Sequence, residues 1–219
     1  MKKTVMEIVD LGLKDYQETF DLQEKIVSEK IGKTMERDTV LVVEHPAVFT
    51  LGKNGGRENL VVSEAFLRSK EIPVVQTGRG GNITFHGPGQ LVVYPIVDLK
   101  QAKVGVADFV YRLEEIMLYT ALQFNVKAVR NGQNHGIWVN NSKLGSVGLS
   151  IRKNVSFHGI ALNVNLDLTP FSWINPCGMS GVAMTSIEQE QKKSGSGDTV
   201  TMDRAKETMI NRIKQWETV

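Results

Sequence analysis

Strand-like runs follow one another along the first half of the chain, and this order limits the fold more than any other feature. Runs rich in β-branched and apolar residues, the pattern typical of strands, lie at 5–9, 39–44, 48–51, 73–76 and 91–97. Pro46 enforces a turn between the second and third runs, so we expect them to form a hairpin or two neighbouring strands. A chain that places strands next to one another without helices between them is not a strictly alternating α/β protein.

Helical patterns are fewer and interrupt this order irregularly. Apolar residues recur at roughly helical spacing between Asp15 and Gly32 and over 108–124, and a short helix is predicted from Ser63. The mixed order of elements predicts an α+β fold, in which helices flank a mixed, largely antiparallel sheet.

The second half of the chain continues in the same way and closes with a helix. Strands are predicted at 137–139, 144–151 and 155–164, and a final amphipathic helix is predicted after Thr201. Residues 190–198, rich in Lys, Ser and Gly, are predicted to be a flexible connector to that helix. The chain has 219 residues and shows no internal repeat or boundary, so we expect residues 1–219 to form a single domain.

The charge and the single cysteine argue against several classes of protein. Lys and Arg number 26 against 24 Asp and Glu, and this small excess gives no sign of a nucleic-acid partner or an anionic membrane. No stretch approaches the ~18 to 20 uninterrupted apolar residues of a membrane-spanning helix, and Glu7 interrupts the start before a signal core develops. Cys177 stands alone, which excludes an internal disulfide and a multi-cysteine zinc site. We therefore expect a cytoplasmic protein without a metal site.

One segment, residues 77–90, is dense in glycine and lies between two predicted strands. Its sequence is TGRGGNITFHGPGQ. Glycines let backbone N–H groups approach a ligand closely, and Arg79 can donate charge-assisted hydrogen bonds to a carbonyl, carboxylate or phosphate. The P-loop pattern is missing, and Ile83 stands where the dinucleotide fingerprint needs its third glycine. A ligand-binding loop and a plain turn between strands are equally compatible with this segment.

Three further segments contain side chains that can do chemistry. Lys143 follows the turn at 140–141, His158 lies in a predicted strand, and Cys177 lies in the Pro/Gly loop NPCG. Taken singly, such a lysine is more often solvated and such a histidine is more often a packed core residue. A cysteine in a Pro/Gly loop favours a reactive thiol slightly over a buried structural one.

Taken together, these segments resemble the lipoyl(octanoyl) transferases, enzymes that move an octanoyl group from acyl carrier protein to a lysine of lipoyl domains. The resemblance spans most of the chain and rests on motifs in the order EHP at 44–46, RGGNITFHGPGQ at 79–90, KLGSVG at 143–148, HGIALN at 158–163 and PCG at 176–178. It implies the α+β fold shared with biotin and lipoate ligases. It also implies octanoyl-acyl carrier protein as the donor, and as acceptors the lipoyl domains of 2-oxoacid dehydrogenases and the glycine-cleavage carrier protein.

The resemblance also implies roles for individual residues. Cys177 corresponds to the acyl-thioester nucleophile and Lys143 to the residue that activates it, since an ammonium stabilises a thiolate and a neutral amine can accept a proton. Thioester exchange is nearly balanced in energy and the final amide is downhill, so the resemblance implies no nucleotide, metal or other cofactor. His86 is also assigned, with His158, to shaping the pocket. The implied substrate-binding residues are Arg79, Gly80, Gly81, Asn82, Ile83, Thr84, Phe85, His86, Ser146, Val147, Gly148, Gly159, Ile160 and Ala161.

Three alternatives stay open on the sequence alone. An ATP-dependent lipoate or biotin ligase shares the fold but needs no cysteine. A Cys/His hydrolase would use Cys177 with His86 or His158 and leave Lys143 idle. A carrier-binding module would clamp an acyl chain without turnover. Cys177→Ser should stop a transferase or a hydrolase but neither of the others, and Lys143→Ala should stop only the transferase.

Overall fold

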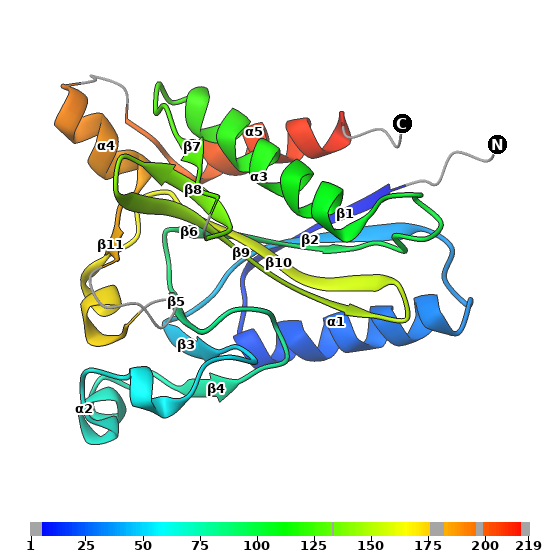
Figure 1. Cartoon of the computed structure of the whole chain (residues 1–219), viewed down its shortest axis with the longest axis horizontal. Coiled ribbons are helices and arrows are strands. Elements are labelled where there is room, and N and C mark those ends of the chain that lie inside the picture. Colours follow the sequence, from blue (N-terminus) through cyan, green and yellow to red (C-terminus); the bar gives the residue numbers. More distant parts are fainter. Residues whose placement is uncertain (1–5, 133, 176–181, 196–198, 216–219) are drawn as a thin grey trace.

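A mixed eight-stranded sheet runs through the middle of the molecule (Figure 1). The computed structural model describes residues 6–132, 134–175, 182–195 and 199–215. The strands lie in the order β1-β2-β6-β10-β9-β8-β7, with β11 paired beside the start of β9. β1 with β2 and β11 with β9 are parallel, and the other neighbours are antiparallel. The strands are β1 (Met6–Leu13), β2 (Asp38–Glu44), β6 (Gln90–Ile96), β7 (Val129–Arg130), β8 (Gly136–Val139), β9 (Ser142–Arg152), β10 (Val155–Asn163) and β11 (Ala183–Met184).

Helices cover both faces of this sheet because its central strands are apolar on both sides. In β2, Val40 and Val42 pack into the hydrophobic core that α3 and α5 share, whereas Leu41 and Val43 point to the opposite face and the core beneath α1. Successive side chains of a strand alternate between faces, so a strand buried on both sides reads as a continuous apolar run. The helices are α1 (Tyr16–Ile31), α3 (Val106–Leu122) and α5 (Met202–Lys214).

A second, three-stranded sheet lies beside the large one and has its own small core. Its order is β4-β3-β5, and the rings of Phe49, Phe85 and Phe171 meet at centroid distances of 5.2 and 5.7 Å. Residues 77–82 connect β4 to β5, so the glycine-rich segment leaves one edge of this sheet and returns at the other. The elements are β3 (Val48–Leu51), β4 (Val74–Gln76), β5 (Ile83–His86), α2 (Glu64–Ser69) and two 3-10 turns at Arg57–Asn59 and Thr169–Trp173.

The expectation that runs 39–44 and 48–51 pair with each other is wrong. β2 pairs with β1 and β6, and β3 pairs with β4 and β5, so the chain crosses between the two sheets at residues 45–47. Pro46 separates the two strands as expected, but His45 is fully buried beside it and hydrogen-bonds to Lys14 and Tyr94 of the large sheet region. The turn therefore redirects the chain instead of folding it back.

The connector predicted over 190–198 is also wrong for its described part. Residues Ile187–Ser194 form helix α4, whose N-cap Ser186 accepts a hydrogen bond from Gln189 N. Ion pairs three and four residues apart, Lys193 with Glu190 and Lys192 with Glu188, lie along its surface. Gly195 ends the helix in the left-handed conformation with φ +69°. Lys192 and Lys193, in the segment predicted to be a flexible connector, are the cations of these ion pairs. Residues 196–198 lie outside the described residues.

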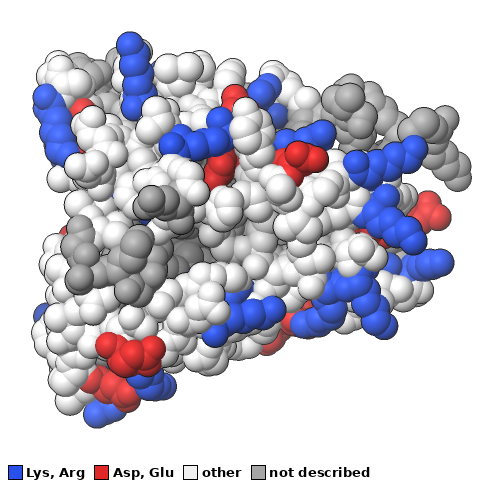
Figure 2. All heavy atoms as spheres, viewed as in Figure 1, with Lys and Arg blue, Asp and Glu red and all other residues white. Residues whose placement is uncertain are grey.

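The predicted α+β class is confirmed, because helices flank a mixed, largely antiparallel sheet. Among the residues described, no helix is both long enough and apolar enough to cross a membrane. Figure 2 shows Lys and Arg side chains interspersed with Asp and Glu over the face viewed, in keeping with a net charge of +2.

Candidate active site

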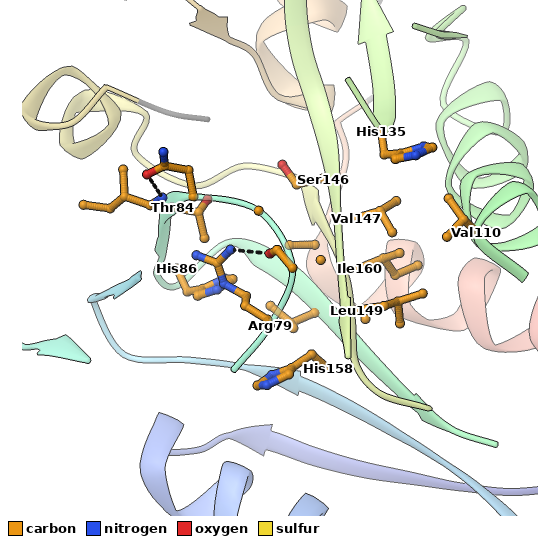
Figure 3. A pocket seen from close by; sticks show the side chains of 18 of the residues that line it. Arg79, Thr84, His86, Val110, His135, Ser146, Val147, Leu149, His158 and Ile160 are labelled. Carbon is orange, nitrogen blue, oxygen red and sulfur yellow. Dashed lines mark hydrogen bonds between the residues drawn. The ribbon is translucent and has the colours of Figure 1, made fainter. Parts of the chain in front are cut away.

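A cavity of about 540 Å³ lies where the glycine-rich loop meets strands β9 and β10. Small-molecule sites in proteins have volumes of this order, with apolar walls and a few polar groups. Figure 3 shows Arg79, His86 and His158 on one side of the strand that carries Ser146, and Val147 on the other. Side chains on both sides of this strand, β9, therefore line the cavity.

The glycine-rich loop is fixed to both sheets by hydrogen bonds. Gly80 N donates to the carbonyl oxygen of Leu149 on β9 at 2.8 Å, and Lys53 N donates to the carbonyl oxygen of Arg79 at 2.9 Å. Arg79 is 8% exposed, and its Nε and Nη2 donate to Thr50 Oγ1 at 3.1 and 2.9 Å. A buried guanidinium thus stands at the cavity wall with its direction set by the small sheet.

A chain of buried hydrogen bonds continues from Thr50 behind the cavity. Thr50 Oγ1 lies 3.4 Å from His86 Nε2, and His86 Nδ1 lies 2.7 Å from Gln90 Oε1. Gln90 Nε2 donates to Asn163 Oδ1 at 2.9 Å, and Asn163 Nδ2 donates to the carbonyl oxygen of Thr185 at 2.9 Å. Burial, followed by the nearby His45, lowers the pKa of His86 from 6.5 to about 3, so its imidazole is neutral at pH 7.

His158 is buried against aromatic rings. Its backbone φ is +53°, a conformation that His adopts more readily than most residues, and Gln23 Oε1 accepts from its backbone N–H at 2.8 Å. The imidazole stacks on Phe20 with ring centroids 5.3 Å apart and planes within 9°. Burial, followed by the charge of Arg79, lowers its pKa from 6.5 to about 3. A neutral imidazole of such low basicity fits the shaping of a pocket better than proton transfer.

Tyr16, at the start of α1, completes this wall. Its ring lies 5.2 Å from the ring of His45 and 6.0 Å from that of His86, and burial raises the pKa of its phenol from 10.0 to about 12. His45 Nε2 and the hydroxyl of Tyr94 are 2.8 Å apart, and burial lowers the pKa of His45 from 6.5 to about 4. All of these rings are uncharged at neutral pH, and they suit an uncharged ligand.

Lys143 stands on the opposite wall, near the start of β9. The residue is 3% exposed, and its Nζ donates to Asn134 Oδ1 at 2.7 Å and lies 5.4 Å from the ring centre of Trp138. Its backbone pairs in parallel with Met184 of β11, and Thr185 N donates to its carbonyl oxygen at 2.9 Å. A lysine this deeply buried beside a cavity is not the solvated residue that lysines near turns usually are.

Glycine at 159 is required by the backbone of the neighbouring strand. A Cβ at this position would lie 2.0 Å from the carbonyl oxygen of Val93 on β6, closer than any side chain tolerates. The HGI stretch at 158–160 therefore packs against β6 on one side and lines the cavity on the other.

Comparisons with known proteins identify the family. A sequence profile described as "Lipoyl protein ligase A/B catalytic domain" matches residues 15–214. The chain is 49% identical to an octanoyltransferase of Desulfotalea psychrophila, over 84% of this chain and 83% of the relative. It is 44% identical to an octanoyltransferase of Syntrophobacter fumaroxidans, over 88% of this chain and 84% of the relative. The chain belongs to the octanoyltransferase family. The resemblance drawn from its motifs is confirmed, and the protein is an acyltransferase of protein lipoylation.

Solved structures show the same fold in this octanoyltransferase and in ligases. A putative lipoate protein ligase from T. acidophilum superposes with a TM-score of 0.71 over 95% of this chain and 83% of its own, at 13% identity. Biotin protein ligase from Aquifex aeolicus in complex with biotin and ATP gives a TM-score of 0.55 over 95% of this chain and 69% of its own, at 15% identity. The expected relationship to biotin and lipoate ligases is therefore confirmed at the level of the fold.

The structure brings the predicted site residues together, with two exceptions. Phe85 points into the small core with Phe49 and Phe171 instead of toward the cavity. Cys177 lies outside the described residues. The predicted residues that line the cavity are Lys143, Arg79, Gly80, Gly81, Asn82, Ile83, Thr84, His86, Ser146, Val147, Gly148, Gly159, Ile160 and Ala161.

Other residues that line the cavity of this octanoyltransferase carry no sequence motif. Tyr16 and Tyr94 come from α1 and β6, and Asn134 and His135 come from the loop before β8. Tyr16, Asn134 and His135 lie far in sequence from the glycine-rich segment, so only the fold brings them to it, whereas Tyr94 follows that segment by four positions. The sequence contains one signal for Tyr94, because this tyrosine lies in an apolar strand. A tyrosine hydroxyl that is buried there needs a hydrogen-bond partner.

Proposed function

We propose that this octanoyltransferase takes the octanoyl group from octanoyl-acyl carrier protein onto Cys177 and passes it to the lysine of a lipoyl domain. The observation that carries the proposal is the buried amine of Lys143, held at the wall of the cavity by Asn134. Cys177 precedes Met184, the β-sheet partner of Lys143, by seven positions in the sequence. The chain thus returns to the strand of the lysine soon after the cysteine.

In the first half-reaction the proposed nucleophile is the Cys177 thiolate, which the Lys143 ammonium stabilises. The thiolate attacks the carbonyl carbon of the carrier thioester and forms a new C–S bond. The C–S bond to the carrier breaks, and the departing thiolate takes a proton from the Lys143 ammonium. Octanoyl-Cys177, a neutral Lys143 amine and a free carrier thiol result, so atoms and charges balance without a nucleotide.

In the second half-reaction, the neutral amine of Lys143 regains a proton. The neutral amine of the acceptor lysine attacks the carbonyl carbon of octanoyl-Cys177, and Lys143 takes the proton that the attacking nitrogen loses. The C–S bond breaks, an amide forms, and Cys177 leaves as a thiolate beside a restored Lys143 ammonium. One lysine therefore serves as acid in the first step and as base in the second.

The acyl chain is proposed to lie in the cavity. Its described walls contain apolar groups such as Val92, Val147 and Ile160, and neutral rings such as those of Tyr16 and His158. An uncharged hydrocarbon loses little by leaving water for such walls, whereas an ionised tail would lose its hydration. The glycines of the glycine-rich loop and of β9 let the protein backbone come close to the acyl chain. The whole set of predicted substrate-binding residues is proposed to contact the acyl chain or its carbonyl group.

The proposed acceptors are the lipoyl domains of 2-oxoacid dehydrogenases and the glycine-cleavage carrier protein, and the proposed location is the cytoplasm.

A Cys/His hydrolase is the weaker candidate. His86 and His158 both have a pKa lowered to about 3, which makes them poor bases for activating a thiol at pH 7.

The mass of the intact protein after mixing with octanoyl-acyl carrier protein tests the proposal. Without ATP or acceptor, we expect one octanoyl group per chain, mapped by peptide analysis to Cys177 and discharged when a lipoyl domain is added. Cys177→Ser should abolish transfer to the domain, because the acyl thioester can no longer form. Octanoylation of the domain that requires free octanoate and ATP, with no adduct on the protein, would overturn the proposal in favour of a ligase.

A further inference from the structure

The loop between β7 and β8 presents an asparagine side chain to the cavity lysine. Asn134 is half-buried, and its Oδ1 accepts a hydrogen bond from Lys143 Nζ at 2.7 Å. The carbonyl oxygen of the same residue accepts from Trp138 Nε1 at 3.3 Å, and Trp138 presents its ring to the amine at 5.4 Å. The amide oxygen and the indole face together define a direction for the lysine amine.

A buried carboxylate ties this loop to helix α3. Glu114 is 5% exposed, and its Oε1 accepts from Gly136 N at 2.8 Å and lies 3.4 Å from His135 Nδ1. Its Oε2 lies 3.3 Å from Arg130 Nε. A buried carboxylate is costly unless hydrogen bonds and opposite charges compensate it. Here the compensating groups lie on both sides of Asn134 in the sequence, so the carboxylate fixes the loop that carries the asparagine.

Gly136 brings the loop into direct contact with the lysine side chain. Its φ is +127°, and a Cβ there would lie 2.2 Å from the carbonyl oxygen of Gly145 and 2.9 Å from Lys143 Cε. Only glycine lets the backbone approach this closely. A loop that packs on the lysine stem and accepts a hydrogen bond from its amine controls where that amine points.

We propose that Asn134 is a positioning residue for Lys143, and that Glu114 acts through Asn134 by holding the loop. The inference rests on the proposed function, in which Lys143 carries the proton. An amide oxygen accepts a hydrogen bond from an ammonium and from a neutral amine alike. It therefore directs Nζ in both half-reactions, whereas a carboxylate in its place would favour the charged form of the lysine.

Several charged and titratable groups line the same cavity or pack on the β7–β8 loop, and they stay constant in the variants below. Glu114 approaches from α3 through Gly136, and His135 comes from the same loop as Asn134. Arg79 of the glycine-rich loop shares the cavity, together with His86 of β5 and His158 of β10. A pH effect of a change at position 134 is therefore measured against an unchanged set of neighbours.

The test measures discharge of octanoyl-Cys177 to a lipoyl domain in a single turnover across a range of pH. Asn134→Ala removes the acceptor, and we expect the discharge rate to fall about 10- to 100-fold with the KM for the domain unchanged. Asn134→Asp keeps the shape and adds a negative charge. Because the introduced carboxylate raises the pKa of Lys143, we expect the pH at half-maximal rate to move up by about one unit or more.

Asn141 offers matched controls, because it is exposed in the β8–β9 turn and belongs to the same sheet region. Asn141→Ala and Asn141→Asp should leave both the rate and its pH dependence as in the unaltered protein. An Asn134→Ala variant within twofold of the unaltered rate, or an Asn134→Asp profile that coincides with the unaltered one, would overturn the inference.

Failure of the proposed function gives a different result. If the unaltered protein forms no octanoyl-Cys177, or if Lys143→Ala discharges it at the unaltered rate, then the proposed roles of the two residues fail. If both of those experiments behave as proposed and the Asn134 variants still match the unaltered protein, then only the positioning role is wrong.

Discussion

The two walls of the cavity differ in their titratable groups. On the wall nearest α1, His86, His158 and Tyr16 are buried, and burial moves their pKa values away from neutrality in the direction of the uncharged form. On the wall formed by β9 and the β7–β8 loop, the buried Lys143 donates to Asn134, and the buried Glu114 accepts from Gly136 N at the end of the same loop.

This difference separates two tasks that would interfere in one place. A hydrocarbon chain is bound best by neutral groups, and the charge of Arg79 on the wall nearest α1 is compensated by hydrogen bonds to Thr50 and to the carbonyl oxygen of Gly80. Proton transfer needs a group that changes charge during the reaction, and such a group needs polar neighbours. The cavity keeps the two sets of side chains on different elements, so each can be altered on its own.

The largest expected effect comes from removing the amine. Lys143→Ala should lower the rate of octanoyl transfer by about 10³-fold, within the range that a lost acid or base usually costs. The measurement is the rate of lipoyl-domain octanoylation, with the exposed Lys127→Ala as the matched control. A Lys143→Ala variant that keeps a tenth or more of the activity would show that the charged wall is not the reacting one.

The buried histidines near α1 should make the stability of the protein depend on pH. The pKa values of His45, His86 and His158 are lowered in the folded protein to about 4, 3 and 3, so below pH 6.5 the unfolded chain binds protons that the folded protein does not. The contribution of these histidines to the free energy of unfolding is complete above pH 6.5, and it is lost progressively as the pH drops toward 4. Three such groups predict a loss of about 4 kcal/mol between pH 7 and 5.5.

Urea unfolding at pH 7, 6.3 and 5.5 checks this expectation. His158→Asn removes one titrating group and retains a residue type that accepts a positive φ, so it should reduce the loss by about a third. A free energy of unfolding that stays level over this range would show that these imidazoles are charged in the folded protein.

The smallest effect distinguishes packing from binding within one strand. Phe85 faces the small core, so Phe85→Leu should lower the free energy of unfolding by about 1 kcal/mol and leave the KM for the octanoyl donor unchanged. Thr84 lines the cavity, and Thr84→Ala should raise that KM a few-fold with little change in stability. A raised KM in Phe85→Leu would return Phe85 to the binding residues.

The sequence predicted elements well where local patterns decide them, and less well where distant partners do. The apolar run at 39–44 predicts a strand. Its pairing with β6 instead of β3 depends on residues about fifty positions away. The Lys, Ser and Gly content of 190–198 predicts a flexible connector where helix α4 (Ile187–Ser194) lies, although Ser186 and Gly195 supply both caps of that helix. Alternation along β5 also places Phe85 on the same side as Ile83, in the small core.

The candidate site follows the same rule. Motif-bearing segments such as 79–84 and 158–161 were predicted as a set, and the fold brings both to one cavity. Tyr16, Asn134 and Glu114 could not be predicted, because an isolated polar residue at the start of a helix, in a loop or within a helix has no local signature. Their positions depend on the packing of α1 and α3 on opposite faces of the sheet.

One series of buried hydrogen bonds behind the cavity runs in a single direction. From first donor to last acceptor the members are Arg79, Thr50, His86, Gln90, Asn163 and Thr185. A guanidinium can only donate and a carbonyl oxygen can only accept, so the two ends of the series leave one consistent order for every proton between them. The tautomer of the imidazole and the orientation of both side-chain amides are therefore set from the ends, and reversing any single link would require reversing them all. The six groups form one continuous series of donors and acceptors from the glycine-rich loop to the segment that follows β11.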